Sequence, residues 1–139
     1  MELGKRLTQR YNDAIAANKT LKDMLTFIEK EGNNLDPFIL QGLKDSVIQR
    51  FEITYDSIFK YLQTLFYKRG IDVGSPRDAF QQCLSQKITN EQETDILFDM
   101  VTDRNLTSHL YNQEMADKVY NRVDKYNKII QVILKRVAV

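Results

Sequence analysis

The sequence contains few of the residues that cross-link a chain through disulfides or interrupt helices and strands. Its 139 residues include one cysteine, two prolines, five glycines and no tryptophan. A single cysteine, Cys83, excludes an intrachain disulfide and is typical of a reducing compartment. Because Cys83 stands between Gln82 and Leu84 on an expected helix, we predict a small packed hydrophobe rather than a nucleophile. At this length the chain can bury a core without staples.

A long apolar run is also missing. No segment approaches the length that crosses a bilayer, and the start of the chain, residues 1–6, has no apolar stretch like a secretion signal. Hydrophobic residues make up 42% of the chain and charged residues 28%, as in soluble globular proteins. We therefore expect one domain over residues 1–139, in the cytoplasm and without membrane contact.

Neither sign of charge is in excess. Twenty lysines and arginines stand against 19 aspartates and glutamates, and the net charge is +1 with no basic block. Non-specific binding to polyanions should therefore be weak. Any contact with a polyanion must come from a local patch of the surface.

The dominant positive signal is helical periodicity. Apolar residues recur at intervals of three and four throughout, and no long strand-like alternation occurs. We predict an all-α antiparallel up-and-down bundle of about five helices, three of them long, with short connections. The expected helices cover residues 3–31, 37–68, 76–86, 91–104 and 112–136.

Capping residues set most of these boundaries. Asp36 can cap a helix that has Pro37 at its first position, and Ser75 opens a capping box that ends at Asp78. Gly32 and Gly70 are placed to stop the first and second helices.

The second helix has two apolar faces. One stripe runs from Leu40 to Leu65, and a further set lies off it. A helix that is apolar on more than one face is buried on more than one side. We interpret the second face as the contact of a homodimer; it consists of Ile48, Phe59, Phe66 and Tyr67.

The chemistry-bearing residues gather between Asp103 and Tyr111. Arg104 can hold a phosphate oxygen, His109 is the only histidine and moves protons near neutral pH, and Tyr111 offers a nucleophilic hydroxyl. On an unbroken helix Arg104 and His109 would point about 140° apart. We therefore predict a helix that ends near Arg104 and restarts at Asn112, with a turned, partly extended link.

The spacing Arg-x4-His-x-Tyr resembles the signature of the HEPN family, in particular the HepT-like ribonuclease toxins and the related nucleotidyltransferase substrate-binding proteins. Further landmarks in the same order extend the resemblance to roughly residues 3–135. They are residues 50–52, Tyr55, residues 59–60, Gly70 and residues 75–80.

The resemblance implies a metal-independent endoribonuclease toxin without a cofactor, with paired motifs at a dimer cleft. Arg104 and His109 would be catalytic, with Asn105 and Ser108 in support. A cognate minimal nucleotidyltransferase antitoxin would neutralise the toxin by transferring AMP to Tyr111. The alternative is a non-catalytic substrate-binding subunit of a two-component nucleotidyltransferase.

Two structural interpretations stay open beside the functional one. A histidine near a helix junction often caps or packs, and Arg104 could simply neutralise the negative end of the preceding helix. Two other landmarks, Arg50 and Glu52, are expected to be structural ion-pairing groups rather than catalytic residues.

Overall fold

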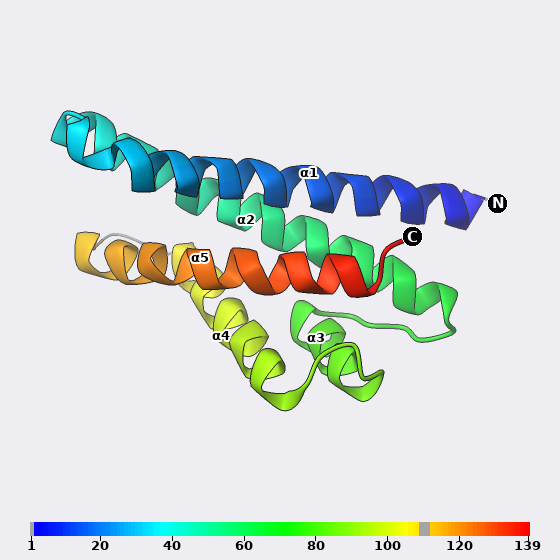
Figure 1. The fold of residues 1–139 in the computed structure, drawn as a ribbon. Helices are drawn as coiled ribbons and strands as arrows, with labels where there is room; N and C mark the ends of the chain where they lie inside the picture. Colours follow the sequence, from blue (N-terminus) through cyan, green and yellow to red (C-terminus); the bar gives the residue numbers. More distant parts are fainter. Residues whose placement is uncertain (1, 109–111) are drawn as a thin grey trace.

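The computed structural model describes residues 2–108 and 112–139 (Figure 1). It confirms an all-α bundle of five α-helices, three of them long, and this described part contains no strand. None of the described helices is both long and apolar enough to cross a membrane. The elements are α1 (Glu2–Glu31), the short 3₁₀ helix η1 (Gly32–Asn34), α2 (Pro37–Lys68), α3 (Pro76–Ser85), α4 (Glu91–Thr107) and α5 (Gln113–Arg136).

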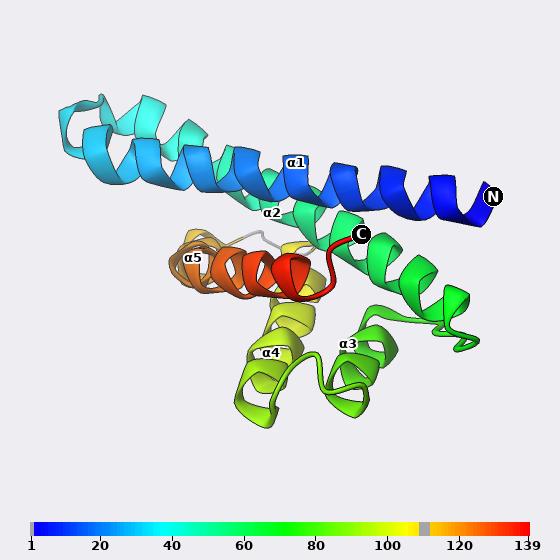
Figure 2. The same ribbon diagram turned by 45° about the vertical axis from the view of Figure 1, so that its right-hand side comes forward.

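The central helix of the bundle is α2, which contacts each of the other α-helices. It runs antiparallel to α1, while α5 lies along the hairpin that these two helices form (Figure 1). The helices α3 and α4 pack below, and α4 is steeply inclined to the long helices (Figure 2). The α4–α5 junction and the α1–α2 turn therefore lie at the same end of the molecule (Figure 1).

The structure confirms the predicted caps at most helix boundaries. The Asp36 carboxylate accepts a hydrogen bond from the Phe38 amide at 2.8 Å, and the Ser75 hydroxyl accepts one from the Asp78 amide at 3.1 Å. Gly70 has a φ of 81°, the left-handed conformation that ends α2. The first helix, α1, also ends directly before Gly32 as predicted, although there the chain continues into η1 without a left-handed residue.

The interpretation of the second apolar face of α2 as a dimer contact is wrong for its central residues. Ile48 and Phe66 are buried inside the chain, and Phe59 packs partly buried against the core. The reason is the central place of α2, which α1 covers on one side and α3, α4 and α5 cover on another. Only Tyr67 of this set is well exposed, at 62%.

A buried polar pair joins α1 to α5. The Asn127 side-chain amide donates to the Asn18 side-chain oxygen at 2.7 Å and to the Asn18 carbonyl at 3.0 Å. Both residues are almost fully buried, so each satisfies a polar group that the other would leave unpaired. The pair fixes how far α1 and α5 can slide along each other.

Candidate functional site

Arg104 lies in the last turn of α4. The helix ends at Thr107 rather than near Arg104, so the prediction of its end was three residues short. A capping box at Asn90 and Glu93 starts the helix, and its final residues remain helical although several of them favour turns. Tertiary contacts explain this, because Asp103 and Arg104 near the end of α4 each form an ion pair with a neighbouring helix.

The Arg104 guanidinium is held by residues of α2 and α4. Its Nη1 donates to Glu52 Oε2 at 2.7 Å and to Thr107 Oγ1 at 3.2 Å, and its Nη2 lies 3.8 Å from Asp56 Oδ2. Thr107 Oγ1 is also 3.0 Å from Glu52 Oε2. We call these four residues the Arg104 cluster. Their contacts fix the direction of the guanidinium at the surface between α2 and α4.

The cluster is half-buried, so its charges interact more strongly than they would in bulk water. The side chains of Arg104 and Glu52 are 24% and 29% exposed, whereas that of Asp56 is 55% exposed. In such surroundings the attraction between charges is stronger than in bulk water. The Nε atom of Arg104 is buried and has no hydrogen-bond partner in the described part of the chain. A phosphate that bound here would have to compete with Glu52 for the guanidinium.

Asp103 ties the same turn of α4 to α5. Its carboxylate receives two hydrogen bonds from Arg122, at 2.7 and 2.8 Å, and a third from the Tyr126 hydroxyl. Asp103 is 4% exposed, and its hydrogen bonds, together with its charge, raise the pKa of Arg122. Burial and the same carboxylate raise the pKa of Tyr126, so its hydroxyl stays protonated and donates. Adjacent residues of α4 therefore anchor the turn to two different helices.

A tyrosine also stands close to the charges of the cluster. Burial raises the pKa of Tyr55 to about 12, the Arg104 charge partly opposes this, and Asp56 adds to it. The ring is buried against Phe51 and Phe80. Tyr55 is therefore a neutral core residue, as predicted from its position on a helical stripe.

The other predicted site residues stand apart from the cluster or outside the described residues. Asn105 is exposed on α4, and Ser108 is the exposed C-cap of that helix. Within the described residues the side-chain hydrogen bonds of Arg104 go to Glu52 and Thr107 rather than to these two. His109 and Tyr111 lie outside the described residues.

The carboxylates of Glu52 and Asp56 that surround Arg104 were not predicted as residues of the site. Glu52 forms an ion pair as expected, but its partner is Arg104 of the motif, whereas Arg50, for which an ion pair was also expected, forms none among the described residues. A usable signal was present: Glu52 and Asp56 are four residues apart and share one face of α2. Within residues 2–108 and 112–139, no three or more histidine, cysteine, aspartate or glutamate side chains are grouped to hold a metal ion.

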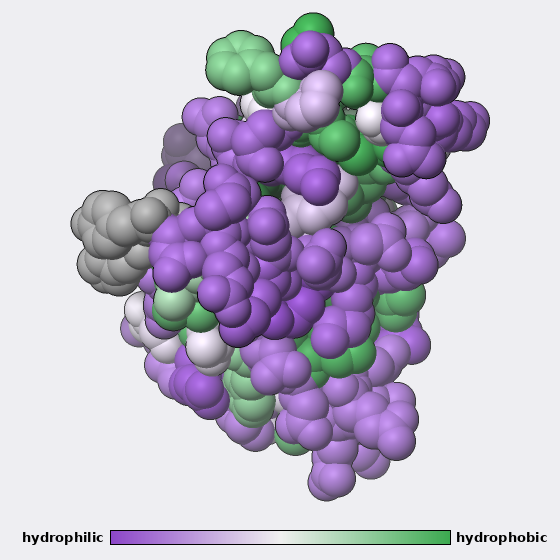
Figure 3. All heavy atoms as spheres, turned by 90° about the vertical axis from the view of Figure 1, so that its left-hand side faces the viewer, coloured by the Kyte–Doolittle hydropathy of each residue, from purple (hydrophilic) through white to green (hydrophobic). Residues whose placement is uncertain are grey.

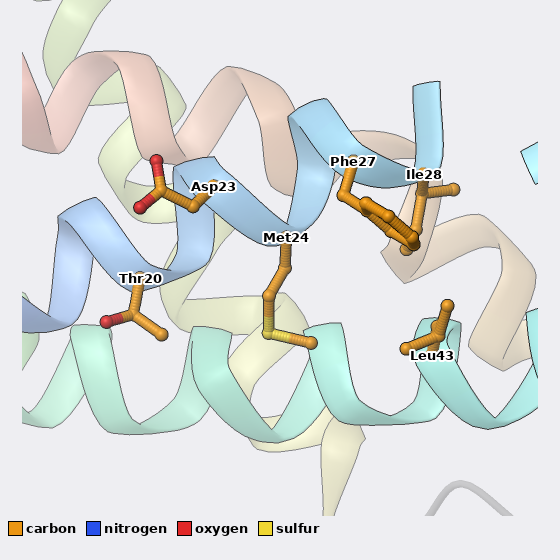
Figure 4. A pocket seen from close by; sticks show the side chains of 6 residues that line it. All are labelled: Thr20, Asp23, Met24, Phe27, Ile28 and Leu43. Carbon is orange, nitrogen blue, oxygen red and sulfur yellow. The ribbon is translucent and has the colours of Figure 1, made fainter. Parts of the chain in front are cut away.

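A separate, apolar hollow of about 260 Å³ lies between α1 and α2. Figure 4 shows Met24 and Phe27 of α1 turned toward Leu43 of α2. Its lining offers few polar groups apart from Thr20 and Asp23, so it lacks the donors that a phosphate requires. Nearby, Phe38 is 86% exposed at the start of α2.

The end of the molecule that carries the α1–α2 turn is mostly hydrophilic. Figure 3 looks at this end: hydrophilic residues dominate it, and apolar residues show at the top and in further patches below. The exposed apolar residues of the turn include Phe27, Phe38 and Ile39.

Residues 9–139 match the family described as nucleotidyltransferase substrate binding protein like. The chain belongs to this family. A search of curated proteins gave no match.

Solved structures of similar fold include two bacterial proteins. A protein from Thermus thermophilus has 30% identity and a TM-score of 0.77, with 91% of this chain and 99% of that chain covered. A Haemophilus influenzae protein, described as having the fold of a substrate binding domain of a nucleotidyltransferase, has 23% identity and a TM-score of 0.76, with 90% and 96% covered.

A third solved structure is a mutant of the toxin–antitoxin pair MntA-HpeT. It has 15% identity and a TM-score of 0.73, and the match covers 95% of this chain and 96% of that chain. At this identity the likeness concerns the fold alone. Members of the nucleotidyltransferase substrate binding protein-like family and this toxin–antitoxin structure thus share one helical architecture with the chain.

Proposed function

We propose that the chain is the toxin of a toxin–antitoxin pair and a metal-independent endoribonuclease, neutralised by a cognate minimal nucleotidyltransferase. The observation that carries the proposal is the rigid placement of Arg104, fixed by Glu52 at 2.7 Å, in the turn that precedes the only histidine. Family membership and the fold shared with the MntA-HpeT pair support it.

The reaction uses the nucleophile that RNA carries. The 2′-hydroxyl oxygen attacks the adjacent phosphorus while a base takes its proton, and the bond from phosphorus to the 5′-oxygen breaks as an acid protonates that oxygen. The products are a 2′,3′-cyclic phosphate and a 5′-hydroxyl. Arg104 stabilises the extra negative charge on the phosphorane. His109 is the proposed proton carrier, and Asn105 and Ser108 are proposed as supporting polar groups.

Two protomers supply the two proton-transfer groups. One chain contains a single histidine, whereas the reaction needs both a base and an acid. A twofold homodimer that brings two α4–α5 junctions together provides two copies of His109 and of Arg104. The buried second face of α2 is not available for this contact, so the proposed interface involves the junction.

Regulation acts on Tyr111. The partner nucleotidyltransferase would direct the tyrosine oxygen at the α-phosphorus of ATP, and the bond to the β-phosphate would break with release of pyrophosphate and of the tyrosine proton. The resulting phosphodiester adds negative charge beside His109 in the sequence. That charge would repel an RNA phosphate and occlude the site.

A second candidate function is a non-catalytic substrate-binding subunit of a two-component nucleotidyltransferase. One observation favours it: the Arg104 guanidinium already has two carboxylate neighbours, Glu52 and Asp56. An arginine whose charge is balanced in this way could serve only to hold α4 against α2.

An RNA cleavage assay in EDTA separates the two candidates. We expect cyclic-phosphate ends from the wild type, no cleavage by His109→Ala, and at least ~100-fold slower cleavage by Arg104→Ala, as is typical for loss of a charge-stabilising group. A matched control is Arg50→Ala, an exposed arginine of α2 outside the cluster. Linear 3′-hydroxyl ends, or full activity of His109→Ala, would refute the mechanism.

Coexpression with the proposed cognate nucleotidyltransferase tests the regulation. Intact mass spectrometry should reveal one added adenylate, located on the peptide that contains Tyr111 and absent from Tyr111→Phe. The subunit alternative predicts a stable complex without this mass shift. Rescue of growth without modification of Tyr111 would mean that the partner inhibits by binding alone.

A further inference from the structure

A polar hollow of about 330 Å³ lies between the first turns of α1 and the last turns of α2. These segments form the end of the hairpin that points away from the α4–α5 junction (Figure 1). The side chains that give the hollow its chemistry are Arg6, Arg10, Gln63, Thr64, Tyr67 and Asp72.

Arg10 is held in place by two residues of α2. Its Nη1 donates to Thr64 Oγ1 and lies 3.5 Å from the Lys60 carbonyl oxygen, and Thr64 in turn donates to that carbonyl at 2.9 Å. The Nε and Nη2 atoms make no hydrogen bond within the described residues and are not sealed from solvent. A half-buried, oriented guanidinium therefore presents free donors to the hollow.

Arg6 adds a second positive charge one turn earlier on α1. Like charges four residues apart on a helix repel, so this arrangement favours an anion between or beside them. Asp72 is the one acidic residue of the lining, and no ion pair within 4 Å joins it to Arg6 or Arg10 in the described structure. The lining thus has a net charge of about one positive, which suits a single phosphodiester better than a triphosphate.

Tyr67 places an aromatic ring at the same hollow. The residue is 62% exposed, unlike the buried tyrosines of the core. An exposed ring next to fixed arginines is the combination that single-strand binding proteins use, because bases stack on the ring while cations hold the backbone. The hollow therefore has groups for both parts of a nucleotide.

The hollow is aligned with the Arg104 cluster along α2. Gln63 follows Glu52 by eleven residues, and Tyr67 follows Asp56 by eleven. Eleven residues of an α-helix turn a side chain by only about 20° and advance it by about 16 Å. The exposed Lys60 stands between the two sites. At about 3.4 Å per stacked nucleotide, the distance corresponds to about five nucleotides of one strand.

We propose that the Arg6–Arg10–Tyr67 hollow is a second RNA site, which holds one phosphodiester and its base about five nucleotides from the phosphate at Arg104. This inference deepens the proposed function and rests on it for the role of Arg104. The positive charge needed for RNA binding is thus local, as the small net charge of the chain requires.

The test is binding of a fluorescein-labelled 12-nucleotide single strand of 2′-O-methyl RNA, measured by anisotropy at several salt concentrations. The blocked 2′-oxygen prevents cleavage, so binding is read independently of catalysis. The variants are Arg6→Gln, Arg10→Gln, Tyr67→Ala and Tyr67→Phe. The charge-matched control is Lys22→Gln, an exposed residue of α1 outside the hollow.

We expect Arg6→Gln and Arg10→Gln each to weaken binding about 3- to 10-fold and to lower the salt slope by about 0.7, the value for one phosphate contact on a single strand. Tyr67→Ala should weaken binding about 5-fold or more, Tyr67→Phe should preserve it, and Lys22→Gln should stay within about 2-fold. Arg6 makes no hydrogen bond or ion pair within the described residues, so its variant controls for misfolding of Arg10→Gln.

Failure of this inference and failure of the proposed function give different results. No binding by the wild type, or equal loss for Arg6→Gln and Lys22→Gln, would refute the second site. If unmodified RNA is still cleaved in that case, the proposed ribonuclease function survives. Binding that depends on Arg6 and Tyr67, without cleavage of unmodified RNA, would instead support the site and refute the ribonuclease.

Discussion

Asp103 and Arg104 are neighbours in the sequence, yet their side chains form ion pairs with different helices. Asp103 holds Arg122 of α5 through two hydrogen bonds, and Arg104 holds Glu52 of α2 at 2.7 Å. Consecutive residues of a helix point about 100° apart, which allows one turn to reach two neighbours. The last turn of α4 is therefore fixed directly before the segment that contains the motif histidine.

Replacing Glu52 with Gln should affect activity more than stability. The pair with Arg104 is about a quarter exposed, so the loss of unfolding free energy should be about 0.5–1.5 kcal/mol. Without the carboxylate the guanidinium loses its strongest positional restraint, and RNA cleavage should fall by about 10-fold. Single-turnover rates and urea unfolding measure the two effects. Asp56→Asn, at 3.8 Å, is the weaker matched control; equal effects of both variants would contradict a positioning role for Glu52.

Replacing Asp103 with Ala should strongly destabilise the fold. The change leaves Arg122 without its partner and removes the acceptor of the buried Tyr126 hydroxyl. Breaking such a pair from one side costs about 2–4 kcal/mol, with a discount because Arg122 is 38% exposed. Urea unfolding at neutral pH measures the change. The exposed control Asp23→Ala, which breaks a surface pair with Lys19, should cost less than about 1 kcal/mol.

Acid should weaken the contact between α4 and the end of α5. The hydrogen bond from Arg136, and then that from the Asn90 amide, lower the pKa of Glu93 below its usual 4.5. A carboxyl with a lowered folded-state pKa stabilises the fold above its unfolded pKa and loses this contribution as the pH falls through its folded pKa. The stability advantage of the wild type over Glu93→Gln should be about 0.5–1 kcal/mol at about pH 6 and should shrink as the pH falls below the usual pKa of 4.5. Urea titrations over a series of pH values from about 6 downward test this; an advantage independent of pH would contradict it.

Cys83 should be inert in the folded protein. The residue is fully buried in α3, and burial raises the pKa of its thiol from 9.0 to about 12. Because the thiolate is the reactive form, a thiol reagent such as Ellman's reagent should label Cys83 at least ~100-fold more slowly at about pH 8 in the native protein than in urea. Rapid labelling of the native protein would contradict the burial, and Cys83→Ser provides the background rate.

Local signals in the sequence predicted the helices well. Asp36 before Pro37, and Ser75 before Pro76, mark helix starts because each side chain accepts a hydrogen bond from a free backbone amide. The end of α4 was harder to predict, since Asn105 and Thr107 favour turns in isolation. Ion pairs made by Asp103 and Arg104 over long sequence distances keep this turn helical, and no local pattern reports them.

The candidate site was only partly predictable for the same reason. The motif identified Arg104, but its partners Glu52 and Asp56 lie about fifty positions earlier. Periodicity placed Ile48 and Phe66 on a second apolar face without indicating what covers that face. The answer depended on the packing of α3, α4 and α5 around α2, which a pattern along one helix does not encode.

The buried Asn18–Asn127 pair sets the axial registry of α5. Two leucines could fill the same space with equal or greater stability, but they would pack nearly as well after a slip of one turn, about 5.4 Å. A slip would carry Arg122 away from Asp103 and displace the start of α5 at Gln113. The position of the start of α5 relative to α4 therefore depends on an amide contact between α1 and α5. Neither of these two helices contributes a residue to the Arg104 cluster.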